Sequence, residues 1–272
     1  MSILGFFDSG FGGLSVVRQV RRLLPDHAFI YLGDNARTPY GGLPADTIFK
    51  FTLEGIIHLF DRGADLVVLA CNTSSSVALR RIQQQYLPIH APKKRVLGIV
   101  IPTAEEVSQQ SSTKVIGVLA TEVTVASQAY PQEVFKIDPS VEVAQQACPA
   151  LVPLIEAGEF EKAESVVGEY LEQLLRKNTQ IDTILLGCTH YALIEDTIRR
   201  LTPKEIRIVS QGEIVGKKLE DYLIRHPEFG TAIERSGQST FLTTAISTRV
   251  ETLATRFYGT RITMQIARID QD

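Results

Sequence analysis

Short apolar runs alternate with amphipathic stretches along the chain, as in a protein whose strands and helices follow one another. The first run, over residues 3–7, has strand length, and a glycine-rich turn follows over residues 8–13. Apolar residues then recur at helical spacing over residues 14–24, and Pro25 ends that helix. The alternation continues with strands over residues 28–32 and 66–70 and helices over residues 47–62 and 75–86.

The rest of the chain has the same pattern. It predicts strands over residues 96–101, 115–120, 183–186, 208–209, 240–242 and 262–267. It predicts helices over residues 103–109, 124–132, 148–157, 161–177, 212–224 and 247–258. Strands that alternate with helices indicate an α/β protein with doubly wound parallel sheets.

One sequence pattern occurs twice. Leu-Val-Val-Leu-Ala-Cys-Asn-Thr (residues 66–73) and Thr-Ile-Leu-Leu-Gly-Cys-Thr-His (residues 183–190) each place a cysteine at the carboxyl end of a buried strand, just before a helix. Because 272 residues are enough for about two domains, the pattern suggests two related halves. We expect two similar doubly wound domains whose mainly parallel sheets face each other across a cleft. The first domain is expected to be discontinuous, with residues 1–97 plus 209–272, and the second to span residues 98–208.

Composition excludes several classes of protein. The 28 basic residues are balanced by 31 acidic ones, so we expect no nucleic-acid partner. No apolar stretch approaches the roughly 18 residues that a membrane span requires, so we expect no membrane contact. The apolar start of the chain lacks a basic leader and does not resemble a signal peptide. With only three cysteines and no disulfide framework, we expect a cytoplasmic protein. The sequence leaves the oligomeric state open, with a homodimer as one option.

The repeated cysteines are candidates for proton transfer. A thiol just before a helix N-terminus lies at the positive end of the helix dipole, which favours the thiolate, and Cys71 and Cys188 both have this predicted setting. His190 and Asp8 could supply and orient protons. Two acid/base groups on opposite faces of one carbon are what stereoinversion requires. Cys148, at an apolar helix start, is interpreted as a small buried hydrophobe.

Two other kinds of site fit the sequence less well. The cysteines and histidines show no zinc-like pairing, so no metal is expected. The turn Gly10-Phe11-Gly12-Gly13 follows a strand, but a dinucleotide fingerprint needs glycine where Ser15 stands. The turn could instead bring Asp8 and Ser9 to a pocket, with its backbone N–H groups facing a carboxylate; a plain tight turn is the alternative.

Four segments together resemble the glutamate racemases. They are residues 7–14 (Phe-Asp-Ser-Gly-Phe-Gly-Gly-Leu), 33–41 (Gly-Asp-Asn-Ala-Arg-Thr-Pro-Tyr-Gly), 70–73 (Ala-Cys-Asn-Thr) and 186–191 (Leu-Gly-Cys-Thr-His-Tyr). The similarity extends through residues 120–127 and Cys148-Pro149 to Glu156. It departs from the family pattern at Asn35, Ala192 and Ser210-Gln211, which we expect to affect loop shape and not the reaction.

The resemblance implies a cofactor-independent isomerase that interconverts L- and D-glutamate and supplies D-glutamate for peptidoglycan. By resemblance, Cys71 takes the α-proton of D-glutamate, assisted by Asp8, and Cys188 takes that of L-glutamate, assisted by His190. Glu156 is implied as a further acidic residue near the second thiol, although a helical acid at this position is also typical of a solvated surface. The implied substrate-binding residues are Asp8, Ser9, Pro39, Tyr40, Gly41, Asn72, Thr73, Thr121, Thr124, Thr189 and His190.

Two alternatives remain beside this interpretation. The first is a racemase of the same superfamily that acts on aspartate or a hydantoin, although aspartate racemases typically carry Glu where this chain has His190. The second is a non-catalytic homologue that binds another protein, against which both cysteines argue. Pyridoxal phosphate would need a lysine Schiff base, and no lysine lies in the matching segments.

Overall fold

The first of two parallel sheets contains the chain's opening strand. The structure, a computed structural model, describes residues 2–269. Six strands pair in the order β10-β9-β2-β1-β3-β4, all parallel. They are β1 (Ile3–Asp8), β2 (Phe29–Gly33), β3 (Ala64–Leu69), β4 (Arg95–Gly98), β9 (Ser239–Thr243) and β10 (Gln265–Ile266).

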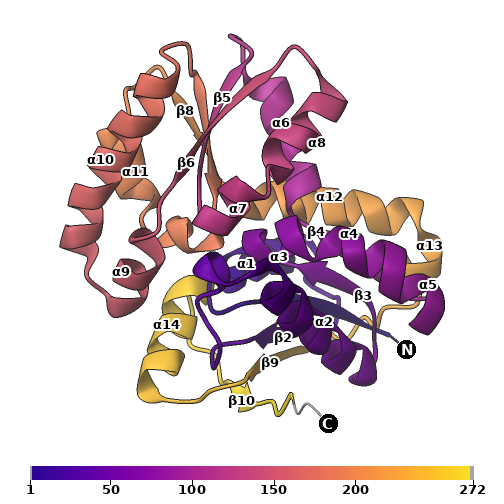
Figure 1. The fold of residues 1–272 in the computed structure, drawn as a ribbon. Helices are drawn as coiled ribbons and strands as arrows, with labels where there is room; N and C mark the ends of the chain where they lie inside the picture. The colour runs from indigo at the N-terminus through magenta and orange to yellow at the C-terminus, as the bar shows by residue number, and fades with distance from the viewer. Residues whose placement is uncertain (1, 270–272) are drawn as a thin grey trace.

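Helices cover both faces of this sheet (Figure 1). Neighbouring residues of a strand point to opposite faces, so Phe6 packs with one layer of helices and Phe7 with the other. The Phe6 face is covered by α1 (Gly13–Leu23), α12 (Gly212–Arg225) and α14 (Thr248–Tyr258), with the short α13 (Pro227–Gly230) after α12. The Phe7 face is covered by α2 (Ala45–Asp61). Burial on both faces explains why β1 is almost wholly apolar.

The chain that follows β3 is a series of short helices. It consists of α3 (Asn72–Val77), α4 (Leu79–Arg81), a π-helical turn η2 (Ile82–Tyr86) and α5 (Leu87–His90). A 3₁₀ turn, η1 (Tyr40–Gly42), precedes α2. The predicted helix over residues 75–86 is therefore interrupted and starts earlier, because Cys71 caps α3.

The second sheet has four parallel strands in the order β6-β5-β7-β8. They are β5 (Val115–Ala120), β6 (Glu142–Ala147), β7 (Thr183–Gly187) and β8 (Arg207–Val209). Ile116 and Val118 pack against α6 (Val100–Gln110) and α8 (Ala129–Ile137). Leu119 faces the opposite layer, which includes α10 (Phe160–Lys177). The remaining helices are α7 (Glu122–Ala126), α9 (Leu151–Ala157), η3 (Thr189–Leu193) and α11 (Glu195–Leu201).

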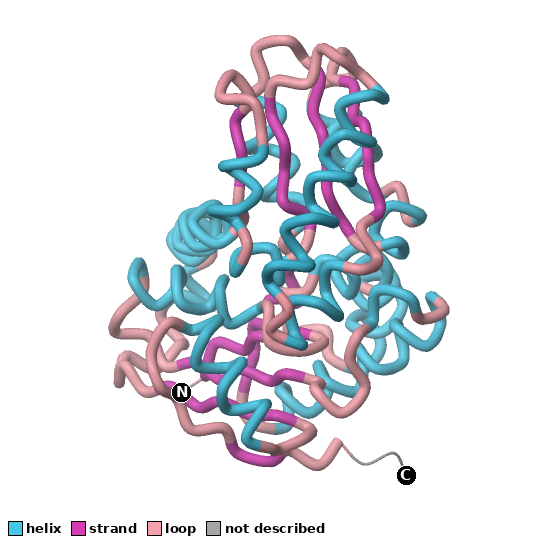
Figure 2. The backbone as a smooth tube through the Cα atoms, turned by 90° about the vertical axis from the view of Figure 1, so that its left-hand side faces the viewer, coloured by secondary structure: helices cyan, strands magenta, loops and turns pink. Residues whose placement is uncertain are grey.

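The chain crosses between the two sheets after β4 and returns after β8 through α12 (Figures 1 and 2). One apolar cluster continues across the junction, where Leu14 of α1 belongs to the same cluster as Leu151 and Ile155 of α9. The loops after β1, β3, β5 and β7 all reach this junction, because the carboxyl ends of parallel strands share one edge of a sheet.

The predicted fold class is confirmed, with two parallel α/β sheets. Some strands differ from the predicted ones where the local hydrophobic pattern is weak. No strand was predicted at β6, whose sequence Glu-Val-Ala-Gln-Gln-Ala is polar because the strand lies at a sheet edge and is mostly half-buried. The predicted final strand over residues 262–267 shrinks to β10, and β4 ends at Gly98 where α6 takes over. The domain boundaries stay a prediction; β8 ends at Val209, one residue past the boundary at 208.

Candidate active site

Cys71 lies where β3 gives way to α3. Its Sγ accepts the N–H of Ser74 at 3.4 Å and lies 3.3 Å from the Ser9 hydroxyl. Burial raises the pKa of this thiol, and so does the nearby Asp8 carboxylate, while the hydrogen bonds from Ser74 and Ser9 act in the opposite direction. Cys71 has the predicted position at the start of a helix, and the N–H of Ser74 lowers its pKa as expected, but desolvation and the Asp8 charge outweigh that effect.

Cys188 has a different environment. It follows β7 and precedes the 3₁₀ turn η3, and the side chain caps no helix. Its Sγ lies 3.9 Å from Nδ1 of His190, whose Nε2 lies 3.0 Å from Oε1 of Glu156. Cys188 does precede a helix as predicted, but that helix is a short 3₁₀ turn that makes no hydrogen bond to the thiol, and the sulfur lies instead beside a buried imidazole and carboxylate.

His190 carries the charge in this chain of groups. Burial alone would lower its pKa, but the hydrogen bonds and charges of Cys188 and Glu156 outweigh that effect, so its pKa lies well above the usual range. An imidazolium donates through both ring nitrogens. One N–H therefore faces the Cys188 sulfur and the other the Glu156 carboxylate, which is only 11% exposed. The Phe257 ring of α14 packs edge-on against the imidazole at 5.2 Å between centroids.

Asp8 ends β1 and is fully buried. Its Oδ1 accepts the N–H of Gly10 at 2.8 Å, and its Oδ2 has no hydrogen-bond partner. Burial raises the pKa of Asp8 to about 6, opposed by the charge of His190 and by N–H groups of the glycine turn. A carboxyl with this pKa exchanges its proton near neutral pH, and its charge acts on both Cys71 and His190.

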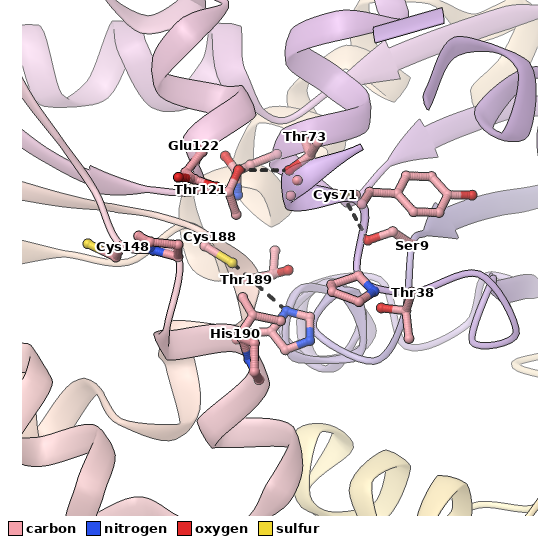
Figure 3. Close-up of a pocket in the computed structure, with 18 residues that line it drawn as sticks. Ser9, Thr38, Cys71, Thr73, Thr121, Glu122, Cys148, Cys188, Thr189 and His190 are labelled. Carbon is pink, nitrogen blue, oxygen red and sulfur yellow. Dashed lines mark hydrogen bonds between the residues drawn. The ribbon is translucent and has the colours of Figure 1, made fainter. Parts of the chain in front are cut away.

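Both thiols face one small cavity (Figure 3). Its volume of about 180 Å³ lies below the roughly 300 to 1,000 Å³ of sites for drug-sized ligands. Eleven predicted site residues line it: Ser9, Pro39, Tyr40, Gly41, Cys71, Asn72, Thr73, Thr121, Cys188, Thr189 and His190. The cavity therefore fits a ligand about as small as an amino acid.

Three predicted residues stand behind the wall of the cavity. Asp8, Thr124 and Glu156 do not line it; Thr124 is hydrogen-bonded to Thr121 and Glu156 to His190, which do, and Asp8 directly precedes Ser9 in the chain. Seven lining residues were not predicted as part of the site: Thr38, Gly42, Glu122, Cys148, Pro149, Val152 and Pro153. The last four follow β6, so recognising that strand would have placed them at the same sheet edge. Burial raises the pKa of Cys148 to about 12, which agrees with its interpretation as a small buried hydrophobe.

Threonine hydroxyls join the two sheets at the cavity. Thr73 Oγ1 lies 3.0 Å from Thr121 Oγ1, which caps α7 and donates to Thr124 Oγ1 at 2.9 Å. Thr73 belongs to α3, next to the first sheet, whereas Thr121 precedes α7 as its N-cap and Thr124 lies in α7, next to the second sheet. Figure 3 shows the bond between Thr73 and Thr121 crossing the site. These hydroxyls offer donors and acceptors to a polar ligand.

The loop over residues 38–42 forms another wall. The Tyr40 hydroxyl donates to buried Asp34, which also accepts from Arg37 at 2.7 Å. Burial raises the pKa of Tyr40 far above its usual range, and the Asp34 carboxylate adds to this effect. Tyr40 therefore stays neutral and anchors the loop through its hydroxyl.

Residues 14–214 match the model of the Asp/Glu/hydantoin racemases. A glutamate racemase from Jannaschia sp. (strain CCS1) is 40% identical, with 96% of this chain and 98% of that protein covered. The chain belongs to this racemase family. It is therefore an isomerase. A solved glutamate racemase isoform from Bacillus anthracis superimposes with a TM-score of 0.88 at 28% identity, covering 98% of this chain and 97% of that one.

A second solved relative carries a ligand. The glutamate racemase from Francisella tularensis, in complex with D-glutamate, has a TM-score of 0.86 at 30% identity and covers 99% of this chain and 98% of that one. In the part of this racemase that the structure describes, no cluster of three or more His, Cys, Asp or Glu residues could hold a metal ion. Within residues 2–269, every helix is too short or too polar to span a membrane.

Proposed function

We propose that this racemase interconverts L- and D-glutamate without a cofactor, with Cys71 and Cys188 as its two acid/base groups. The observation that supports this most is the arrangement of the thiols. Cys71 comes from the first sheet and Cys188 from the second, and both line one cavity of amino-acid size. A proton can then leave one face of the α-carbon while another arrives at the opposite face.

The reaction balances with no external reagent. A thiolate takes the α-proton, the C–H electrons remain on the α-carbon, and the opposite thiol gives its proton to that carbon from the other side. By family resemblance, Cys71 receives the proton of D-glutamate and Cys188 that of L-glutamate. One sulfur must be protonated and the other ionised at the start of each turnover.

The surroundings of the two sulfurs differ. Burial and Asp8 favour the protonated form of Cys71. His190 is placed to exchange a proton with Cys188, because its Nδ1 lies 3.9 Å from that sulfur. For D-glutamate, Cys71 must first lose its proton and Cys188 must carry one. We assign Asp8, with a pKa of about 6, as the acceptor from Cys71 and His190 as the donor to Cys188.

The α-carbanion needs stabilisation that water does not provide. Donors fixed in advance, such as the hydroxyls of Ser9, Thr73 and Thr189 and the backbone N–H groups at the strand ends, can stabilise charge as it develops. Exclusion of water strengthens each of these contacts. Among the described residues that line the cavity there is no lysine for a pyridoxal phosphate Schiff base.

The choice of glutamate rests on the relatives, several of which are named glutamate racemases at about 40% identity over nearly the full chain. Aspartate or a hydantoin is the second candidate, since the family model includes both. We further propose that the enzyme works in the cytoplasm and supplies D-glutamate for peptidoglycan, which rests on family resemblance alone.

The test is an assay of the purified enzyme with each enantiomer of glutamate, without added cofactor or metal. Either enantiomer should proceed to equal amounts of both, because enantiomers have the same free energy in an achiral solvent. Cys71→Ser and Cys188→Ser should be inactive and Cys148→Ser active. Activity that requires pyridoxal phosphate, or that a chelator abolishes, would contradict the proposal.

A further inference from the structure

Asn72, the residue after Cys71, belongs to a buried cluster of polar side chains. The cluster consists of Asn72 at the start of α3, Tyr130 on α8 and Gln211, which precedes the first residue of α12. All three side chains are at least 96% buried. The cluster therefore joins the Cys71 turn of the first sheet to a helix of the second sheet and to the segment that connects them.

The hydrogen bonds in this cluster are reciprocal. Asn72 Nδ2 donates to Gln211 Oε1 at 2.6 Å, and Gln211 Nε2 donates back to Asn72 Oδ1 at 2.9 Å. The Tyr130 hydroxyl donates to Asn72 Oδ1 at 2.6 Å and accepts from Gln211 Nε2 at 2.7 Å. Burial raises the pKa of Tyr130 well above its usual range, so its hydroxyl remains a donor.

The donor and acceptor inventory of Asn72 decides what it can offer the cavity. An amide oxygen has two acceptor sites and an amide nitrogen two N–H groups. Both oxygen sites are occupied, by Tyr130 and Gln211, and one N–H goes to Gln211. One N–H remains, and Asn72 lines the cavity. Asn72 can therefore act there only as a donor, which suits a carboxylate.

We infer that Tyr130 and Gln211 are positioning residues, which hold the Asn72 amide with its free N–H toward the carboxylate of an anionic amino acid. The inference rests on the proposed function. The two residues do not touch the cavity themselves and act through Asn72. The hydrogen bonds of Gln211 argue against the expectation that Ser210-Gln211 affects only loop shape.

A double-mutant cycle tests this inference. Tyr130→Phe keeps the ring and removes the hydroxyl, and it should lower kcat/KM for glutamate about tenfold, as expected for one hydrogen bond of about 1.4 kcal/mol. The loss should fall mainly on KM, because the Asn72 N–H binds substrate before and during the reaction. In an Asn72→Ala background the same change should cost less than twofold, since the residue it acts through is gone. Tyr222→Phe, at a half-buried tyrosine on α12, is the matched control and should be neutral.

Each outcome decides the matter. A wild-type enzyme inactive toward glutamate would overturn the proposed function, and this inference with it. An active wild type with Tyr130→Phe within twofold of it would overturn the inference alone. Equal losses with and without Asn72 would show a merely structural role and would also overturn it.

Gln211→Met, which keeps the chain length and removes the amide, should repeat the Tyr130→Phe result in every arm. The Kd for D-glutamate provides a second readout where turnover is low.

Discussion

Glu156→Gln should change the pH dependence of the reaction through His190. The Glu156 carboxylate lies 3.0 Å from the imidazole, and both side chains are nearly buried. Two unit charges about 4 Å apart interact by about 4 kcal/mol at an effective dielectric constant of about 20. The substituted glutamine amide would keep an oxygen acceptor but lose the charge, so the imidazolium would lose a large part of this stabilisation.

The sign of the effect follows from the raised pKa of His190. In the wild type the imidazolium persists through neutral pH, and activity that needs it declines only on the alkaline side. Because about 1.4 kcal/mol corresponds to one pH unit, even half of the interaction should move this alkaline limb down by more than about one pH unit.

The assay is kcat against pH from each enantiomer. Separate kcat values are needed because kcat/KM must be equal in both directions when the equilibrium constant is one. The L-glutamate direction, in which Cys188 is the base, should show the larger change. Glu159→Gln, at an exposed ion pair with Lys162, is the matched control and should leave the profile unchanged. An alkaline limb that stays in place in Glu156→Gln would refute the coupling of Glu156 to His190.

Three further perturbations test other parts of the site. Gly12→Ala should lower kcat at least tenfold, because the added Cβ would lie 2.3 Å from the Thr189 hydroxyl. Unchanged kinetics would show that the contact between the Gly12 turn and Thr189 can rearrange at little cost. Asp8→Asn should become more stable relative to the wild type as pH rises, by up to about 3 kcal/mol between pH 4 and 7, because a buried carboxyl with a raised pKa costs stability once it is ionised. The free energy of unfolding by denaturant, measured at both pH values, tests this, and a constant difference between the two proteins would contradict it. Glutamate should be preferred over aspartate by a large factor in kcat/KM, because a shorter side chain leaves buried donors unpaired, and comparable values would count against the assignment.

Strand ends were the most informative feature of the sequence. The runs before Cys71 and Cys188 are strongly apolar, since both strands are central in their sheets and buried on both faces. Their apolar pattern alone places both cysteines at the carboxyl ends of the strands, where ligands bind in open α/β sheets. The resemblance to the glutamate racemases then identified most of the residues that line the cavity.

Other features depend on contacts between distant segments. Glu156 meets His190 across 34 residues, and Gln211 meets Asn72 across 139, so neither pairing leaves a local pattern. Cys148 lines the cavity because it directly follows β6. The position of β6 was not predictable, because it is a polar edge strand without a clear apolar face. The balance of burial against helix N–H groups at Cys71 likewise depends on packing by the whole fold.

The most direct test of the two-thiol account is a half-reaction that needs only one base. Elimination of a leaving group from the β-carbon of each enantiomer of a substrate analogue requires removal of the α-proton but no return of a proton to that carbon. The account predicts that Cys71→Ser still processes the L-analogue and Cys188→Ser the D-analogue, while both fail to racemise glutamate. If both variants favour the same enantiomer, or if Cys148→Ser is as damaging as either, the assignment of one thiol to each face is wrong.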